Sequence, residues 1–368
     1  MTAQTFRIAV LPGDGIGIEV MGPCLALLRA VSDDIGGFVL EFDMLEAGAG
    51  TYRDTGSALP EATLEAARSA DAILLGAMGL PDIRYPDGTE IAPQIDLRGL
   101  LGLYAGVRPM RKVRGIPSPL VDTRAEEIDF VLIRESTEGL FYSHGKGEVD
   151  GDREARETMV ITRDTSERLF RFAFRLAERR KTRGTSGRVT CVDKANVFAA
   201  FAFFRKIFDE TAAAHPDIVR DHAYVDATAL NFVRRPWDYD VMVTENMFGD
   251  ILSDLGAGLI GGLGMAPSAD IGDDHAVFQP CHGTAPDIAG QGLANPTAMF
   301  LSAAMMLDWL SERSGVAACA TAAMRIQDAV DEAFACGTLT PTEMGGTAGT
   351  TAIADAVIGA ASADASPI

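Results

Sequence analysis

Three arginines stand in short stretches of the sequence that could meet at an anionic ligand: Arg98 in IDLRG, Arg108 in GVRP and Arg134 in IRES. A guanidinium group binds a carboxylate through two parallel N–H donors, so three converging arginines would hold a di- or tricarboxylic acid. Each arginine alone is more often part of a surface ion pair, because arginine side chains are mostly exposed. The carboxylate-binding hypothesis therefore depends on the residues around them.

Two carboxylates in ENMFGDILSD (245–254) have the spacing of a shared metal site. Asp250 and Asp254 are four residues apart, so on a helix they lie on one face. Asp226, in the strand-like segment YVDATAL, is a candidate third ligand. Oxygen ligands without nearby His or Cys favour Mg²⁺ or Mn²⁺ over zinc. The alternative is an acidic helix face in contact with solvent.

Lys194 and Tyr142 are candidates for proton transfer. Lys194 in VDKANVF lies between a short strand and a helix, where a bound cation can lower the lysine pKa enough for it to accept a proton. Most lysines, by contrast, lie on the surface. In RESTEGLFYS (134–143), Tyr142 carries a hydroxyl proton and Phe141 does not. Neighbouring side chains of an extended segment point in opposite directions, so the two cannot both face one site.

Two glycine-bearing segments are candidates for ligand binding. LPGDGIGIEV (11–20) fails the GxGxxG dinucleotide fingerprint because Ile18 occupies the position of the third glycine. Both a structural tight turn and a turn that binds a ligand through its backbone remain open for it. HGTAPDIAGQGLANP (282–296) is a long stretch without helix or strand pattern, and such loops in compact domains are usually functional.

The composition limits the class of partner. The chain has 52 acidic and 32 basic residues and a formal net charge of −20, which disfavours nucleic acids and anionic membranes. No apolar run reaches the ~18 residues of a transmembrane helix, and the N-terminal stretch lacks the apolar core of a signal peptide. The five cysteines share no metal-ligand spacing and suit a reducing compartment. We expect a cytoplasmic protein.

Strand-like and helical patterns alternate along the 368 residues, a length typical of about two domains. Apolar runs at 6–11, 71–78, 129–135, 188–193, 238–244 and 276–280 predict strands, and helical periodicity is present at 165–181, 196–214 and 296–313. This alternation predicts an α/β fold. The polar, glycine-bearing stretch 143–157 should project as a loop or arm.

The order and spacing of these motifs resemble the β-decarboxylating dehydrogenases, a family that includes isopropylmalate, isocitrate, homoisocitrate, tartrate and D-malate dehydrogenases. The resemblance is carried by LPGDGIG, LR, VRP ten residues later, RExTxG, VDKANV, YVDA, NMFGDILSD and HGTAPDIAG. It implies a two-domain α/β subunit of the isopropylmalate dehydrogenase type, not a Rossmann fold, with discontinuous domains around mixed sheets. Residues 1–103 plus 257–368 would form the cofactor-binding domain, and 104–256 the substrate, metal and dimerisation domain.

The family also implies a homodimer with shared active sites. Lys194 and Asp226 would come from one subunit; Arg98, Arg108, Arg134, Asp250 and Asp254 would come from the other. The implied reaction is NAD-dependent oxidative decarboxylation of a 2-hydroxy acid with a β-carboxylate, assisted by Mg²⁺ or Mn²⁺. Asp226, Asp250 and Asp254 would hold the metal, Asp226 would also contact the substrate, and Lys194 would help remove the hydroxyl proton.

The implied cofactor residues lie in the 282–296 loop. They are His282, Gly283, Thr284, Ala285, Asp287, Ile288 and Asn295. A carboxylate at 287 accepts a hydrogen bond from a ribose 2′-OH and repels a 2′-phosphate, whereas NADP-using relatives carry a basic and an aromatic residue at 287 and 288. The resemblance therefore implies NAD.

The position of the catalytic acid departs from the family pattern. The family's acid tyrosine lies seven residues after the arginine, and position 141 is a phenylalanine. Either a local bulge brings Tyr142 into the site, or Phe141 fills the space of the tyrosine and a water molecule delivers the proton.

The substrate-selecting segment EIAPQIDLRG (90–99) also departs from the pattern. Ala92 and Gln94 replace the serine and asparagine of many isocitrate enzymes, and Gln94-Ile95 replaces the apolar pair of isopropylmalate enzymes. Gln279 stands where isopropylmalate enzymes usually have glutamate. We expect 3-isopropylmalate as the substrate, with tartrate, D-malate or isocitrate as alternatives. A regulatory homologue in a hetero-oligomer is the non-enzyme alternative.

Overall fold

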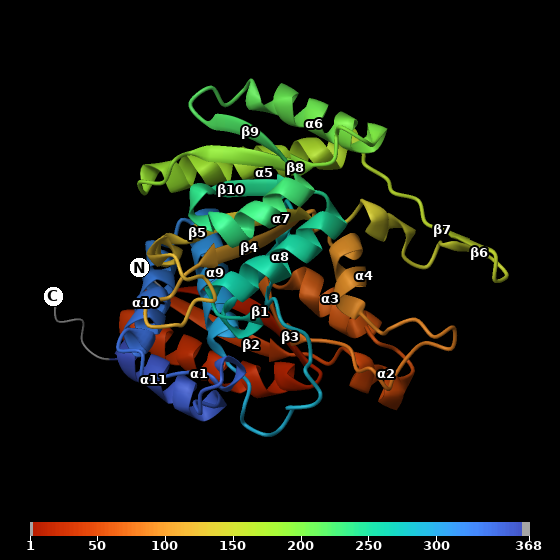
Figure 1. The fold of residues 1–368 in the computed structure, drawn as a ribbon. Coiled ribbons are helices and arrows are strands. Elements are labelled where there is room, and N and C mark those ends of the chain that lie inside the picture. The colour runs from red at the N-terminus through yellow and green to blue at the C-terminus, as the bar shows by residue number, and fades with distance from the viewer. Residues whose placement is uncertain (1–2, 363–368) are drawn as a thin grey trace.

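The computed structural model describes residues 3–362, which form an α/β fold around a mixed sheet of ten strands in the order β2-β1-β3-β12-β11-β4-β5-β10-β8-β9 (Figure 1). The predicted α/β fold class is therefore confirmed. The strands of this sheet are β1 (Gln4–Gly13), β2 (Phe38–Met44), β3 (Ala72–Ala77), β4 (Ala105–Arg111), β5 (Asp129–Glu135), β8 (Arg188–Asp193), β9 (Val219–Tyr224), β10 (Val241–Thr244), β11 (Pro267–Ile271) and β12 (Ala276–Pro280).

Helices pack on this sheet along its whole width. They are α1 (Ile16–Ile35), α2 (Ala49–Thr55), α3 (Glu61–Ser69), α4 (Pro93–Leu100), α5 (Arg163–Thr182), α6 (Ala199–Ala212), α7 (Val225–Arg234), α8 (Asn246–Ile260), α9 (Thr297–Ser314), α10 (Ala317–Phe334) and α11 (Thr350–Ser362). Helices α1 and α9 contact the strands of the first half of the sheet, and α5 and α8 those of the second. Within residues 3–362, no helix is both long and apolar enough to cross a membrane.

The two halves of the sheet meet where β11 pairs with β4 in antiparallel orientation, with Ala269 opposite Val107. Strands from residues 4–77 and 267–280 lie on one side of this junction, and strands from residues 105–244 lie on the other. This order is compatible with the division into 1–103 plus 257–368 and 104–256, which stays a prediction. Among the described strands of this sheet, antiparallel pairing is confined to the contacts of β11 with β12, β11 with β4 and β4 with β5.

Most of the elements predicted from the sequence are present. The six predicted strands correspond to β1, β3, β5, β8, β10 and β12, and the three helices to α5, α6 and α9. Strands β2, β4, β9 and β11 were missed. Strand β9 is mostly exposed and alternates poorly, and β11 (PSADI) begins with a proline and contains small and polar residues.

The prediction that Asp226 lies in a strand is wrong. Strand β9 ends at Tyr224, and Asp226 lies in the first turn of helix α7. Thr228 and Phe232 of this helix are buried four residues apart, which is a helical period. A carboxylate in the first turn also suits the positive end of the helix dipole. The alternation of apolar and polar residues in YVDAT suggested a strand, so the helical pattern was not recognised from the sequence.

The predicted arm is present as a small hairpin that extends away from the body of the molecule (Figure 1). Its strands, β6 (Glu148–Asp150) and β7 (Glu154–Arg156), are exposed and pair only with each other in the described residues. Gly151 in the connecting turn has a φ of 61°, a left-handed conformation that favours glycine.

The LPGDGIG turn between β1 and α1 has a structural role through its aspartate. Asp14 is buried, and its carboxylate accepts backbone hydrogen bonds from Ala49 (2.7 Å), Gly50 (2.8 Å) and Gly79 (2.9 Å). These donors belong to the start of α2 and to the segment after β3. One carboxylate therefore holds together the segments that follow three neighbouring strands.

Replacing Asp14 with alanine should destabilise the protein, because three N–H groups, two of them buried, would lose their charged acceptor. We expect a loss of about 2–4 kcal/mol in the free energy of unfolding, measured by urea denaturation. Asp43→Ala, on an exposed position of β2, is the matched control. A loss of stability no larger than that of the control would show that the carboxylate does not hold these segments.

Candidate active site

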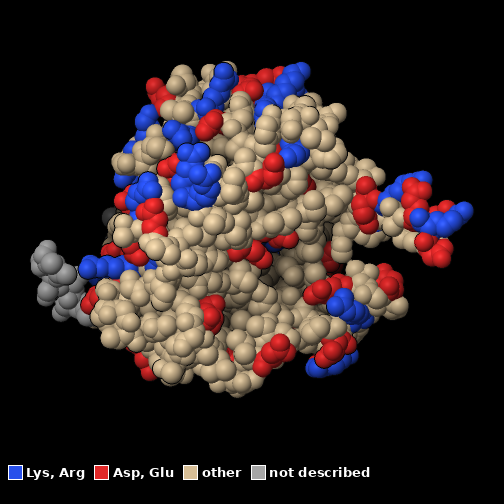
Figure 2. Space-filling view, in the orientation of Figure 1, with Lys and Arg blue, Asp and Glu red and all other residues tan. Residues whose placement is uncertain are grey.

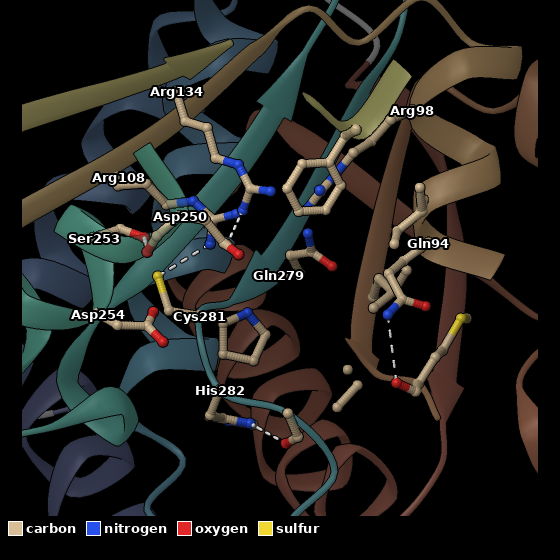
Figure 3. Close-up of a pocket in the computed structure, with 18 residues that line it drawn as sticks. Gln94, Arg98, Arg108, Arg134, Asp250, Ser253, Asp254, Gln279, Cys281 and His282 are labelled. Carbon is tan, nitrogen blue, oxygen red and sulfur yellow. Dashed lines mark hydrogen bonds and ion pairs between the residues drawn. The ribbon is translucent and has the colours of Figure 1, made fainter. Parts of the chain in front are cut away.

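The three arginines that the sequence analysis singled out line one cavity of about 220 Å³ (Figure 3). Arg98 comes from α4, Arg108 from β4 and Arg134 from β5. Asp250 and Asp254 of α8 line the same cavity, as do Gln94 and Ile95 of α4 and His282 of the loop after β12. The cavity thus combines residues from both halves of the sheet.

The arginines are buried rather than part of surface ion pairs. Arg98 Nε donates to Asp270 Oδ2 at 3.1 Å, and Arg134 Nε donates to Asn246 Oδ1 at 2.9 Å. Arg134 also forms an ion pair with Asp250. The guanidinium groups of Arg98 and Arg134 are therefore each bound by acceptors of the protein, while their other N–H donors remain for a ligand.

Arg108 contacts sulfur rather than oxygen. Its Nη1 donates to Cys281 Sγ at 3.2 Å, and its buried Nε has no hydrogen-bond partner among the described residues. A buried N–H without an acceptor is costly, so Arg108 is less fully satisfied than the other two arginines.

The charges of the cavity shift the pKa values of Arg134 and Asp270. Burial, together with the positive charges of Arg98 and Arg108, lowers the pKa of Arg134 to about 10. Burial raises the pKa of Asp270, but the charges of the three arginines outweigh this effect and hold its pKa below the usual value. Arg134 and Asp270 are thus both charged at neutral pH.

The two aspartates of α8 project into the cavity from successive turns of the helix (Figure 3). Burial and the negative charge of Asp250 raise the pKa of Asp254, and Arg108 and Arg134 offset part of this rise. The helix approaches β5 closely at Gly249, where an added Cβ would lie 2.6 Å from the Cβ of Arg134. This glycine allows the aspartates to stand next to the arginines.

Lys194 and Asp226 lie together but outside this cavity. Lys194 follows β8, as predicted, and forms an ion pair with Asp226 of α7, whose side chain is 68% exposed. Within the described residues, no three His, Cys, Asp or Glu side chains are grouped closely enough to hold a metal ion. One subunit therefore brings together Asp250 and Asp254 but not the third predicted ligand.

Phe141, not Tyr142, faces the cavity. The guanidinium carbon of Arg134 lies 4.9 Å from the centroid of the Phe141 ring. Tyr142 is 45% exposed, and Lys146 Nζ lies 4.0 Å from the centroid of its ring. Both residues belong to the 3₁₀ turn Leu140–Ser143, in which successive side chains are rotated by about 120°. A bulge that would bring Tyr142 inward is absent from this turn.

The predicted cofactor loop, 282–296, begins beside the LPGDGIG turn. Ile16 N donates to Thr284 O at 2.8 Å, and Thr284 Oγ1 donates to Gly79 O at 2.7 Å. An added Cβ on Gly15 would lie 2.2 Å from Thr284 O, so glycine is needed for this approach. Ala285 has a φ of 38°, which is uncommon for a residue other than glycine. Burial lowers the pKa of His282.

The far end of the loop is held by a carboxylate of α1. Glu19 accepts hydrogen bonds from Gly290 N (2.9 Å) and Ala294 N (3.1 Å) and from the hydroxyl of Thr350, at the start of α11. Asn295 Nδ2 donates to Glu343 Oε1 at 2.8 Å. Asp287 is exposed between these two anchored ends. The loop is therefore fixed while its middle stays accessible.

Sequence reasoning missed several polar residues of the site. Asp270, Ser136 and Cys281 all contact the arginines or their partners. Asp270 is part of a short run of small and polar residues that gave no strand signal. Only the order of the strands, with β11 beside β4, brings it to Arg98.

Comparison with known proteins gives consistent matches over nearly the whole chain. The sequence model of a family described as isocitrate/isopropylmalate dehydrogenase matches residues 7–357. The 3-isopropylmalate/3-methylmalate dehydrogenase of Methanocaldococcus jannaschii is 43% identical over 352 residues, 95% of this chain and 97% of the relative. The 3-isopropylmalate dehydrogenase of Lactococcus lactis is 40% identical, with 96% of this chain and 98% of the relative covered.

Solved structures give the same result. The crystal structure of isocitrate dehydrogenase from Methylococcus capsulatus superposes with a TM-score of 0.83 at 36% identity, covering 97% of this chain and 99% of that one. A β-decarboxylating dehydrogenase from Thermococcus kodakarensis, in its apo form, superposes with a TM-score of 0.77 at 37% identity, covering 97% and 96%.

Proposed function

The chain belongs to the isocitrate/isopropylmalate dehydrogenase family, and we propose that it catalyses the NAD-dependent oxidative decarboxylation of a 2-hydroxy acid with a β-carboxylate. The observation that carries this proposal is the convergence of three buried arginines on one cavity, because such a cluster suits the carboxylates of this substrate class. The proposed substrate is 3-isopropylmalate, supported by the names of relatives that are 40–43% identical.

The residues of α4 at the cavity wall suit two kinds of substrate. Ile95 offers an apolar surface for an alkyl group on C3, as 3-isopropylmalate has. Gln94 Nε2 is directed at Met78 O, 3.5 Å away, and its buried Oε1 has no hydrogen-bond partner. A buried acceptor suits the second hydroxyl that tartrate carries on C3 and that 3-isopropylmalate and D-malate lack, so tartrate is the alternative that this residue favours, with D-malate and isocitrate after it.

The residues of the cavity fit one half of a divalent-metal site. Asp250 and Asp254 supply oxygen atoms from one face of α8. Burial and, after it, the negative charge of Asp250 raise the pKa of Asp254, and a bound cation would offset both effects. Mg²⁺ or Mn²⁺ bound there would acidify the substrate hydroxyl and polarise the ketone that forms from it. Asp226 would complete the ligand set from a second copy of the chain, because in its own subunit it pairs with Lys194 outside the cavity.

A homodimer is supported by apolar side chains on the surface of the helices that carry these aspartates. Leu230 and Val233 of α7 and Ile251 of α8 are exposed. The surface over α7 and α8 is mostly uncharged and lies beside a hollow bordered by acidic side chains (Figure 2). Pairing of these surfaces would bury the apolar side chains and bring Lys194 and Asp226 of one copy toward the cavity of the other.

Each residue then has a role in the proposed reaction. Arg98, Arg108 and Arg134 would bind the two carboxylates and fix the orientation of the C2–H bond. NAD, held by the loop 282–296, would supply the hydride acceptor. Lys194 of the second copy receives the hydroxyl proton. Loss of the β-carboxylate as CO₂ would leave an enolate. A water molecule would give a proton to its carbon and take one back from the protonated Lys194, because Phe141, which has no acidic proton, occupies the position that faces the cavity. Tyr142 has no part in this route.

The loop 282–296 is the proposed NAD site. Hydrogen bonds hold its backbone at both ends, so the loop loses less conformational entropy when a cofactor binds. Asp287 in its exposed middle would accept from the 2′-OH of the adenosine ribose and repel a 2′-phosphate.

The proposed reaction is tested by a panel of 3-isopropylmalate, D-malate, tartrate and isocitrate with NAD and Mn²⁺, followed by NADH absorbance. We expect the highest kcat/KM with 3-isopropylmalate and loss of turnover in EDTA that is restored by added Mn²⁺. Binding of these acids without NADH formation would favour a regulatory homologue. Turnover that survives complete metal removal would rule out the metal role of the aspartates.

Tyr142→Phe should leave kcat within about twofold of the parent, because the phenol lies outside the cavity and a water molecule supplies the proton. The measurement is steady-state NADH formation with the preferred acid. A drop in kcat of about a hundredfold or more would restore Tyr142 as the acid and would require the 3₁₀ turn to rearrange on binding.

Asp287→Lys should reverse the cofactor preference. We expect kcat/KM for NAD to fall by about tenfold or more, because a charged hydrogen bond to the ribose is lost, and kcat/KM for NADP to rise. Asp328→Lys, on an exposed position of α10, makes the same charge change away from the loop and is the control. A parent enzyme that prefers NADP would overturn the cofactor assignment.

A further inference from the structure

A buried carboxylate that the proposed reaction does not use directly lies behind the arginine cluster. Asp270 of β11 is 1% exposed. Its Oδ2 accepts from Arg98 Nε at 3.1 Å and from Gln279 Nε2 at 2.8 Å, and its Oδ1 accepts from Ser136 Oγ at 3.0 Å. Three donors from three different elements therefore converge on one carboxylate.

The surrounding backbone leaves room for this contact. An added Cβ on Gly106 of β4 would lie 2.6 Å from Ser136 Oγ and 3.1 Å from Asp270 Oδ1. Because Asp270 occupies the Nε–H of Arg98, the remaining guanidinium donors of that arginine are the ones left for a substrate. Asp270 thus acts on the cavity through Arg98 and through its charge.

The charged side chains at the cavity are balanced only when Asp270 is included. Arg98, Arg108 and Arg134 are matched by Asp250, Asp254 and Asp270. A divalent cation would add two positive charges, which two substrate carboxylates would neutralise. Lys194 and Asp226 of a second copy would cancel each other. A third carboxylate would add a negative charge that no described side chain at the cavity compensates, and such a charge is costly in a site of low dielectric constant.

We propose that Asp270 is a positioning residue of the substrate site that fixes Arg98 and makes the site discriminate against acids with a third carboxylate. This inference rests on the proposed function, because it assumes that the cavity binds the carboxylates of the substrate. It extends that function by assigning the preference for two carboxylates over three to a residue that does not touch the substrate.

Asp270→Asn separates charge from geometry. The asparagine Oδ1 can accept from both Arg98 and Gln279, and its Nδ2 can donate to Ser136 Oγ, so every hydrogen bond has a replacement. We expect the ratio of kcat/KM for isocitrate to that for 3-isopropylmalate to rise by about tenfold or more, because one buried negative charge is removed. The KM for NAD should stay within about twofold, because Asp270 makes no hydrogen bond to the described residues of the proposed NAD loop.

Two further variants test the role of charge at the neighbouring position. Gln279→Glu alone places a second carboxylate against Asp270, and because two carboxylates in contact share one proton, the charge at the site and the ratio should stay close to the parental values. The double variant Asp270→Asn with Gln279→Glu keeps one negative charge beside Arg98 and should also keep the parental ratio. Because the double variant leaves the charge unchanged, a ratio about tenfold or more away from the parental one would overturn the proposal even if Asp270→Asn alone folds poorly.

A binding measurement without turnover keeps this inference separate from the proposed reaction. Thermal protection by tricarballylate, with three carboxylates, is compared with protection by succinate, with two, in the absence of metal and NAD. Asp270→Asn should increase the affinity for tricarballylate more than that for succinate. Unchanged ratios in both assays, in a folded variant, would overturn the role of Asp270. Absence of NADH formation by the parent would overturn only the proposed reaction.

Discussion

The burial of three like charges in one small cavity is the constraint on which the rest of the site depends. A buried guanidinium is stable only if carboxylates or other acceptors replace its hydration. Asp250 and Asn246 meet this need for Arg134, and Asp270 meets it for Arg98. These partners come from α8, which packs on β4 and β5, and from β11, which pairs with β4. The ion pairs of the cavity therefore depend on this packing.

The arginine cluster also crosses the junction between the two halves of the sheet. Arg98 and Asp270 come from the half that contains β11, and Arg108 and Arg134 come from β4 and β5 on the other side. A ligand bound by all three arginines would therefore join the two halves. Any displacement along the junction of β11 and β4 would change the distances between the arginines, and thereby the fit of the ligand.

The sequence was sufficient to predict the elements with strong periodicity and the residues that define the motifs. Helix α5 was predicted because its apolar residues recur at helical spacing between an acidic start and a basic end. Asp270 could not be predicted, since its importance comes from the neighbour relation of β11 and β4, which are far apart in sequence. An extended segment was expected at Phe141 and Tyr142, but the two residues lie in a 3₁₀ turn, and this turn decides which side chain faces the cavity. The Asp226 assignment failed because a five-residue alternation is too short to distinguish a strand from the first turn of a helix.

The attachment of the 282–296 loop has a consequence for biosynthesis. Glu19 belongs to the first helix of the chain, and Thr350, which donates to Glu19 and whose backbone N–H donates to Gly292 O at 2.9 Å, begins the last. On the ribosome, the loop is translated well before Thr350 leaves the exit tunnel. The loop can therefore make these contacts only after the segment that contains Thr350 has been released, and a nascent chain that stalls before α11 would lack them.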